Sequence, residues 1–229
     1  MKIPLAIRGV KDVVWAPGTF FTELQTAPKM WPTIIVPYLL LFFIVILWYH
    51  TAAEVIAASH IVDGNLSDME LKYQTLFGSE NLVTVLKKTQ LVGYGGMVLL
   101  TPLLMALIGY LLIGLVKSGS KYSQILSIIL YGEIIYRIGD ILAALTMFWR
   151  NDPNVAFSLG GILGKFTTLT PALKNLLALT NPFLIWEIIV IAIGFSAVVL
   201  CARSKSVKLS ILTVCSLIFA RIIISLWIQ

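Results

Sequence analysis

Charged residues are scarce in this chain, and that scarcity decides its broad class. Asp, Glu, Lys and Arg make up 12% of the 229 residues, against roughly 25% in an average soluble domain. Hydrophobic residues make up 59%, and the mean hydropathy is +0.93. Apolar runs long enough to span a bilayer recur along the chain. This composition excludes an ordinary soluble domain and indicates one membrane domain whose apolar surface is solvated by lipid.

Cysteine and histidine are nearly absent, which excludes two further classes of protein. Cys201 and Cys215 make neither a disulfide framework nor a metal site, and we interpret them as small core residues. His50 and His60 each precede an acid by three or four residues, so a metal site outside the membrane can be drawn. Two isolated histidines beside acids are more often ordinary polar residues. We therefore predict no metal site and no cofactor.

Catalytic motifs are also missing. The sequence contains neither an HExxH motif nor a GxSxG elbow, and the glycines of 93–96 fit neither a phosphate loop nor a dinucleotide fingerprint. An enzyme is disfavoured, although missing motifs leave intramembrane catalysis open.

Small residues in the second apolar run, residues 91–116, favour close helix packing. The helix face that carries them would pack against a second copy of the chain, in a homo-oligomer, or against a protein partner. The small residues are Gly93, Gly95, Gly96, Ala106, Gly109 and Gly114.

Five apolar runs predict an all-α, polytopic bundle of five transmembrane helices over residues 31–229. The predicted spans are Trp31–Trp48, Leu91–Val116, Tyr122–Trp149, Pro182–Cys201 and Leu209–Ile228. No cleavable signal peptide is expected ahead of them, so the first span would act as the insertion signal. Short helices are expected in the two long loops. One begins at a capping box at Ser67 and ends near Gly78, and the other covers residues 172–179. Ser79 is expected to cap a helix that runs into the second span.

Residues 1–30 form an arm ahead of the first span. Ile3, Ile7, Val10 and Val14 recur at steps of three or four, which predicts an amphipathic helix lying on the membrane surface. Pro17 and Gly18 are expected to break it, and a second helix is expected over 20–25. The favoured interpretation is an anchoring arm, and recruitment of a cytosolic partner is the alternative.

The net charge of +6 is better explained by the orientation of the chain in the membrane than by nucleic-acid binding, because the basic residues are scattered at the ends of apolar runs. Lys and Arg number four in the arm, two in the turn 117–121 and three in the turn 202–208. The much longer loops 49–90 and 150–181 hold three each. The positive-inside rule then predicts a cytoplasmic N-terminus and an outer C-terminus in the cell (inner) membrane. The bilayer is the expected partner, and nucleic acid is not.

Five ionisable residues lie inside the predicted spans: Glu133, Arg137, Asp140, Glu187 and Arg221. Because charge at that depth is costly in lipid, these side chains should gather in the interior of the bundle. We expect Glu133 and Asp140 to flank Arg137, and Arg221 to bridge to Glu187 or Asp140. The cluster is either a structural clasp that fixes which helices meet or the lining of an ion or proton pathway.

Local patterns along the chain carry a family resemblance. The arm contributes two phenylalanines between two prolines, at Pro17, Phe20, Phe21 and Pro28. The run KYSQIL at 121–126 leads into the third span, where Tyr131 follows, and NPFLIW at 181–186 opens the fourth span, where Gly194 follows. In this layout the chain resembles the Yip family of Ypt/Rab GTPase-interacting membrane proteins, in its prokaryotic form.

The resemblance implies five spanning helices and a cytosolic N-terminus. Eukaryotic members are associated with vesicle traffic, membrane shaping and Rab binding, but their long N-terminal region and Asp-Leu-Tyr-Gly-Pro type motif are missing here. We therefore expect a non-enzymatic protein that organises the membrane or recruits a partner. The alternatives are a small transporter or channel that uses the charged cluster, and an intramembrane lipid-modifying enzyme.

Overall fold

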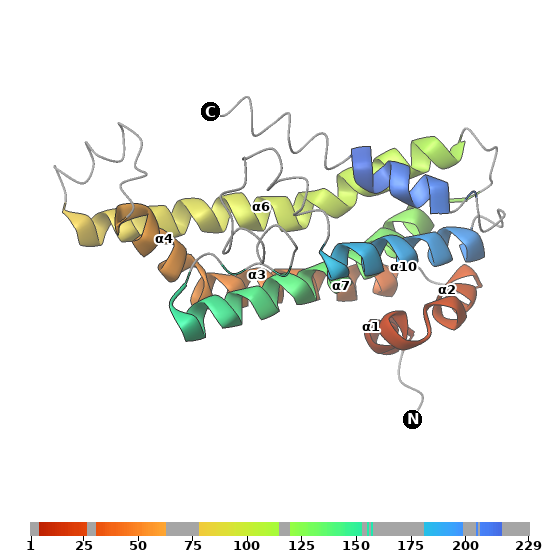
Figure 1. The fold of residues 1–229 in the computed structure, drawn as a ribbon. Coiled ribbons are helices and arrows are strands. Elements are labelled where there is room, and N and C mark those ends of the chain that lie inside the picture. The colour runs from red at the N-terminus through yellow and green to blue at the C-terminus, as the bar shows by residue number, and fades with distance from the viewer. Residues whose placement is uncertain are drawn as a thin grey trace, which may run out of the picture. The chain divides into compact units, whose positions relative to one another are not determined.

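The described part of the chain is entirely helical. The computed structural model describes residues 5–26, 31–62, 78–114, 120–152, 155, 157, 181–198, 205 and 207–216. Figure 1 shows the helices that they form. The labelled helices are α1 (Leu5–Trp15), α2 (Pro17–Gln25), α3 (Trp31–Thr51), α4 (Ala53–Val62), α6 (Ser79–Gly114), α7 (Tyr122–Arg150) and α10 (Pro182–Val198). A further apolar helix covers Val207–Ser216. The predicted all-α class is confirmed for these residues.

Two of these helices are long and apolar enough to cross a membrane, namely α3 and the part Leu82–Gly114 of α6. Of the other predicted spans, α7 is 29 residues long and carries three charged residues near its middle, and α10 is 17 residues long. The loop helices predicted from Ser67 and over 172–179, and the fifth span beyond Ser216, lie outside the described residues.

Helix boundaries follow the predicted signals in most places. The third span was predicted to begin at Tyr122 and the fourth at Pro182, and α7 and α10 begin there. The predicted helix from Ser79 is present and runs without interruption into the second span. Gly78, immediately before it, has a φ of +83°, a conformation that glycine adopts without strain. By contrast, α4 lies in a stretch that the sequence had indicated as a polar loop.

Residue contacts divide the chain into two compact units. Unit 1 comprises the described residues within Met1–Leu41, Leu99–Arg137 and Phe183–Gln229. Unit 2 comprises those within Phe42–Val98 and Ile138–Pro182. In unit 2, Ala57 of α4 packs against Leu82 and Leu86 of α6.

The core of unit 1 is centred on the first half of α7. Gly132 and Gly194 let α7 and α10 approach closely: a β-carbon at Gly132 would lie 2.7 Å from Ile191 Cγ1, and one at Gly194 would lie 2.5 Å from Ile128 Cγ2. Residue 132 of α7 meets residue 191 of α10, and residue 128 meets residue 194. Because the residue numbers rise along α10 as they fall along α7, the two helices run antiparallel. Small residues at such a contact are typical of helix packing in membranes.

The N-terminal arm packs on this core. Phe20 of α2 meets Tyr131 of α7 edge to face, with ring centroids 4.6 Å apart, and both side chains are fully buried. Gly9 of α1 lies against the same two rings. The break between α1 and α2 falls at Ala16, one residue before the predicted break, because Pro17 takes the first helical position of α2.

The side of α1 that packs on the protein differs from the apolar face that was predicted to lie on the membrane surface. Gly9 and Val13 are buried, whereas Ile7 and Trp15 are exposed. Arg8 forms an ion pair with Asp12 at 2.7 Å and another with Glu23 of α2, so the two short helices are also held together by charge. An exposed apolar edge on α1 thus remains available to a membrane surface.

Candidate functional site

Glu133 and Arg137 form a buried ion pair in the middle of α7. Arg137 Nη2 donates a hydrogen bond to Glu133 Oε1, and the side chains are 5% and 2% exposed respectively. The spacing of four residues brings the two groups together across one helical turn. The guanidinium also lies over the ring of the neighbouring Tyr136, 5.0 Å from its centroid. The two opposite charges are therefore neutralised within a single turn of one helix.

Glu187 lies on α10 at the level of that pair. Its side chain is buried, and its Cγ would be 3.6 Å from a β-carbon at Gly132. Glu187 is one turn before Ile191, the residue that packs on Gly132. Because the helices are antiparallel, one turn along α7 from Gly132 reaches the stretch between Glu133 and Arg137. This register sets Glu187 beside the Glu133–Arg137 pair, whereas the sequence had named only Arg221 as its possible partner.

Asp140 has a partner that the sequence did not predict. Its Oδ2 accepts a hydrogen bond of 3.0 Å from the hydroxyl of Tyr94 on α6. Tyr94 stacks on Trp48 of α3, with ring centroids 4.1 Å apart and planes 19° apart. Trp48, Tyr94 and Asp140 belong to unit 2. Arg137 belongs to unit 1, although it lies on the same helix as Asp140. The sequence had predicted Asp140 beside Arg137, and Tyr94 and Trp48 were missed.

Arg221, the fifth member of the predicted cluster, lies outside the described residues. Its bridge to Glu187 or Asp140 therefore stays a prediction.

Hydroxyl groups link α3 to its neighbours in unit 1. Thr33 and Ser127, from α3 and α7, are both buried, and their hydroxyl oxygens lie 3.2 Å apart. Tyr38 of α3 donates a hydrogen bond to the Leu99 carbonyl of α6 over 3.4 Å. Such contacts satisfy polar groups between helices where water is excluded. Sequence reasoning missed them, because a lone hydroxyl in an apolar run carries no periodic signal.

Metal-binding chemistry finds no support in the described residues, where no group of three or more His, Cys, Asp or Glu side chains could hold an ion. His50 packs edge to face on Tyr49, and Cys215 is a free, exposed thiol rather than the core residue that we predicted. Cys201 lies outside the described residues, as do the side chains of Glu54 and His60.

The chain matches no protein-family model, no curated protein and no solved structure.

Proposed function

We propose that the chain is an integral membrane protein of the Yip type, with five spanning helices and a cytoplasmic N-terminus, that organises the membrane or recruits a protein partner. In the most apolar 18-residue stretch of each helix, only 33% of the residues of α3 and 39% of those of α6 are buried within the protein. A core helix of a soluble protein would be mostly buried, so these proportions support a lipid-exposed location.

The exposed apolar residues form stripes at helical spacing, which supports the same location. On α3 they are Trp31, Ile35, Leu39, Phe42, Phe43 and Ile46. On α7 they are Ile138, Leu142, Leu145, Phe148 and Trp149. Stripes of this length on several helices exceed what soluble proteins leave exposed to water.

The Glu133–Arg137 ion pair is the observation that carries a structural rather than a catalytic role. A charge in a membrane interior is tolerated when an opposite charge and a hydrogen bond compensate it. Here both conditions are met inside one turn of α7, next to the glycine contact that joins α7 to α10. The pair acts as a clasp that makes α7 tolerable in lipid and fixes the face it turns to α10.

A small transporter or channel is the second candidate, and Glu187 is the observation that favours it. A second buried carboxylate at the level of an ion pair is an arrangement that proton and ion pathways use. In that case Arg137 would change partner between the two acids during transport.

Flux measurements in proteoliposomes separate the two candidates. If the ion pair has a structural role, the double variant Glu133→Leu/Arg137→Leu should fold and should still cross-link in membranes to the same partner as the wild type. Neither the variant nor the wild type then carries flux for protons or a panel of ions. For the pathway, the wild type carries ion-dependent flux and the folded double variant loses it. A wild type with flux and no reproducible cross-linked partner would overturn the proposed role.

The proposed orientation has its own test. With Cys201 and Cys215 replaced by Ser, a single cysteine at Trp15 should react with an impermeant maleimide only after the cells are opened. A cysteine at Trp149, near the outer end of α7, should react in intact cells. The reverse pattern would contradict the cytoplasmic N-terminus.

A further inference from the structure

Unit 1 contains an open groove of about 830 Å³ that the proposed function does not use. It lies between α2, α10 and the start of the Val207–Ser216 helix, and its volume falls within the roughly 300–1,000 Å³ of small-molecule sites. Residues from all three helices line it, among them Pro17, Thr22, Ile189, Ile193, Ser196 and Val207.

The long wall of the groove is apolar and belongs to α10. That helix has two faces: Glu187, Ile191 and Gly194 are buried toward α7, while Ile189 and Ile193 line the groove. The lining extends along α10 from Ile188 to Ala197, which is about 13.5 Å of helix. A track of this kind matches an extended hydrocarbon chain.

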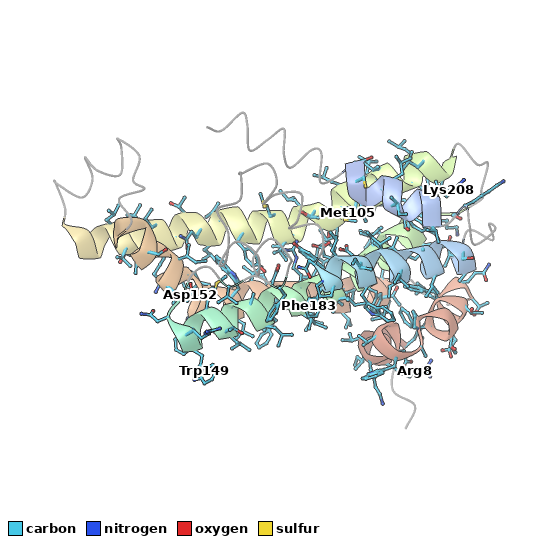
Figure 2. The ribbon with its side chains drawn as sticks, in the orientation of Figure 1. Arg8, Met105, Trp149, Asp152, Phe183 and Lys208 are labelled. Atoms are coloured by element: carbon cyan, nitrogen blue, oxygen red, sulfur yellow. The ribbon has the colours of Figure 1, made fainter. Side chains whose placement is uncertain are left out.

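Two lysines lie close in the sequence to a residue that lines the groove. Lys205 stands two residues before Val207 and Lys208 one residue after it, and both are exposed. Figure 2 shows Lys208 at the end of its helix that lies next to the C-terminal part of α10. Glu23, which follows the lining residue Thr22, is already paired with Arg8. The unpaired formal charge next to Val207 is therefore basic, and Thr22 and Ser196 contribute hydroxyl groups to the lining.

We propose that this groove binds one anionic phospholipid of the cytoplasmic leaflet, with an acyl chain along α10 and the phosphate at Lys205 and Lys208. The combination of an apolar track with a basic end is complementary to an amphiphile that carries a negative head. The inference rests on the proposed membrane location and orientation, which put the arm and the turn before Val207 on the cytoplasmic side. Juxtamembrane lysines attract anionic lipids by about 1 kcal/mol each, equivalent to roughly fivefold in affinity.

Native mass spectrometry of the full chain in detergent, titrated with phosphatidylglycerol or phosphatidylcholine, tests the proposal. Lys205→Gln/Lys208→Gln should weaken phosphatidylglycerol binding about fivefold for each lysine removed and change phosphatidylcholine binding little. The matched control Lys11→Gln/Lys121→Gln removes two exposed lysines that neither line the groove nor neighbour a lining residue, and should leave both lipids unaffected. Ile193→Trp fills the track and should weaken both lipids, whereas Leu212→Trp, on an exposed apolar position outside the groove, should not.

Equal phosphatidylglycerol affinity for the two double-lysine variants would overturn the proposal, whatever the behaviour of the tryptophan variants. So would a concentration-dependent dimer of the wild type that Ile193→Trp dissolves, since a second copy would then be the occupant. Carbonate extraction of the membranes from which the chain is purified distinguishes a failure of the groove proposal from a failure of the proposed function. A chain that resists extraction but binds lipid equally in all variants refutes only the groove, and a chain released by carbonate refutes the proposed function itself.

Discussion

Ile128 of α7 packs against Gly194 of α10 with both branches of its side chain. A β-carbon at Gly194 would lie 2.5 Å from Ile128 Cγ2 and 3.1 Å from Cγ1, with Phe21 of α2 at 3.2 Å on another side. Since an isoleucine in a helix has one strongly preferred χ1, rotating the side chain does not make room. Three helices of unit 1 therefore meet at a position that tolerates no side chain.

Gly194→Ala should lower the free energy of unfolding by about 1–3 kcal/mol, because the new methyl group forces α2 or α7 to move. That corresponds to a fall in Tm of roughly 2–4 °C per kcal/mol for a chain of this size. Gly93→Ala is the control, since no described atom lies within 4 Å of its β-carbon position and alanine is the better helix former. Thermal unfolding in detergent that ranks Gly194→Ala at or above Gly93→Ala would show that the contact is not tight.

The Glu133–Arg137 pair should behave as a unit in stability measurements. Glu133→Leu leaves a buried guanidinium without its carboxylate and should destabilise the protein by about 3–5 kcal/mol. Glu133→Leu/Arg137→Leu removes both charges and should cost less than the single variant, because no unpaired buried charge remains. A double-mutant cycle read by thermal unfolding in detergent checks this. Additive effects of the two substitutions would mean that the pair contributes no coupling.

The helices that the sequence predicted well are those with a local signal. The apolar run and its ends defined α7 almost to the residue, and Pro182 marked the start of α10. The helix α4 was missed because His50, Glu54 and His60 made its surroundings look like a polar loop. Its small residue Ala57 is buried by Leu82 and Leu86, some 25 to 30 positions later in the chain. Local composition cannot report such a contact.

The candidate site divides in the same way. Glu133 and Arg137 were predicted together because a four-residue spacing is a local property of a helix. The level of Glu187 depends on the register of α10 against α7, which Gly132 and Gly194 set. Asp140 was predicted beside Arg137 from spacing alone, and its hydrogen bond with Tyr94, 46 positions away, was not predicted. An aromatic residue among glycines gave no sign of that role.

Docking of the arm on α7 should depend on Phe20. Removing its ring in Phe20→Ala leaves a cavity between α1, α2 and Tyr131, which should destabilise the arm by about 3–5 kcal/mol. Hydrogen exchange at the amides of α1 and α2 should then rise toward that of an undocked helix. Trp15→Ala is the matched control, because that large aromatic side chain is 79% exposed and its loss should leave exchange unchanged. Equal exchange in both variants would contradict docking through Phe20.

Tyr94 and Asp140 should be coupled through their hydrogen bond. Tyr94→Phe keeps the ring that stacks on Trp48 and removes only the hydroxyl, so its effect isolates the bond of 3.0 Å to Asp140 Oδ2. A hydrogen bond to a charged group contributes about 1.5–3 kcal/mol, and the loss should appear in thermal unfolding. Asp140→Leu should cost a similar amount in the wild type, since the tyrosine hydroxyl then loses its acceptor.

In the Tyr94→Phe background the same Asp140→Leu substitution should cost less, because the hydrogen bond is already absent. Tyr94→Leu supplies the contrast, as it removes the stack on Trp48 together with the hydroxyl and should be more destabilising than Tyr94→Phe. If Asp140→Leu costs the same in both backgrounds, the carboxylate is held by other groups and the bond to Tyr94 does not stabilise unit 2.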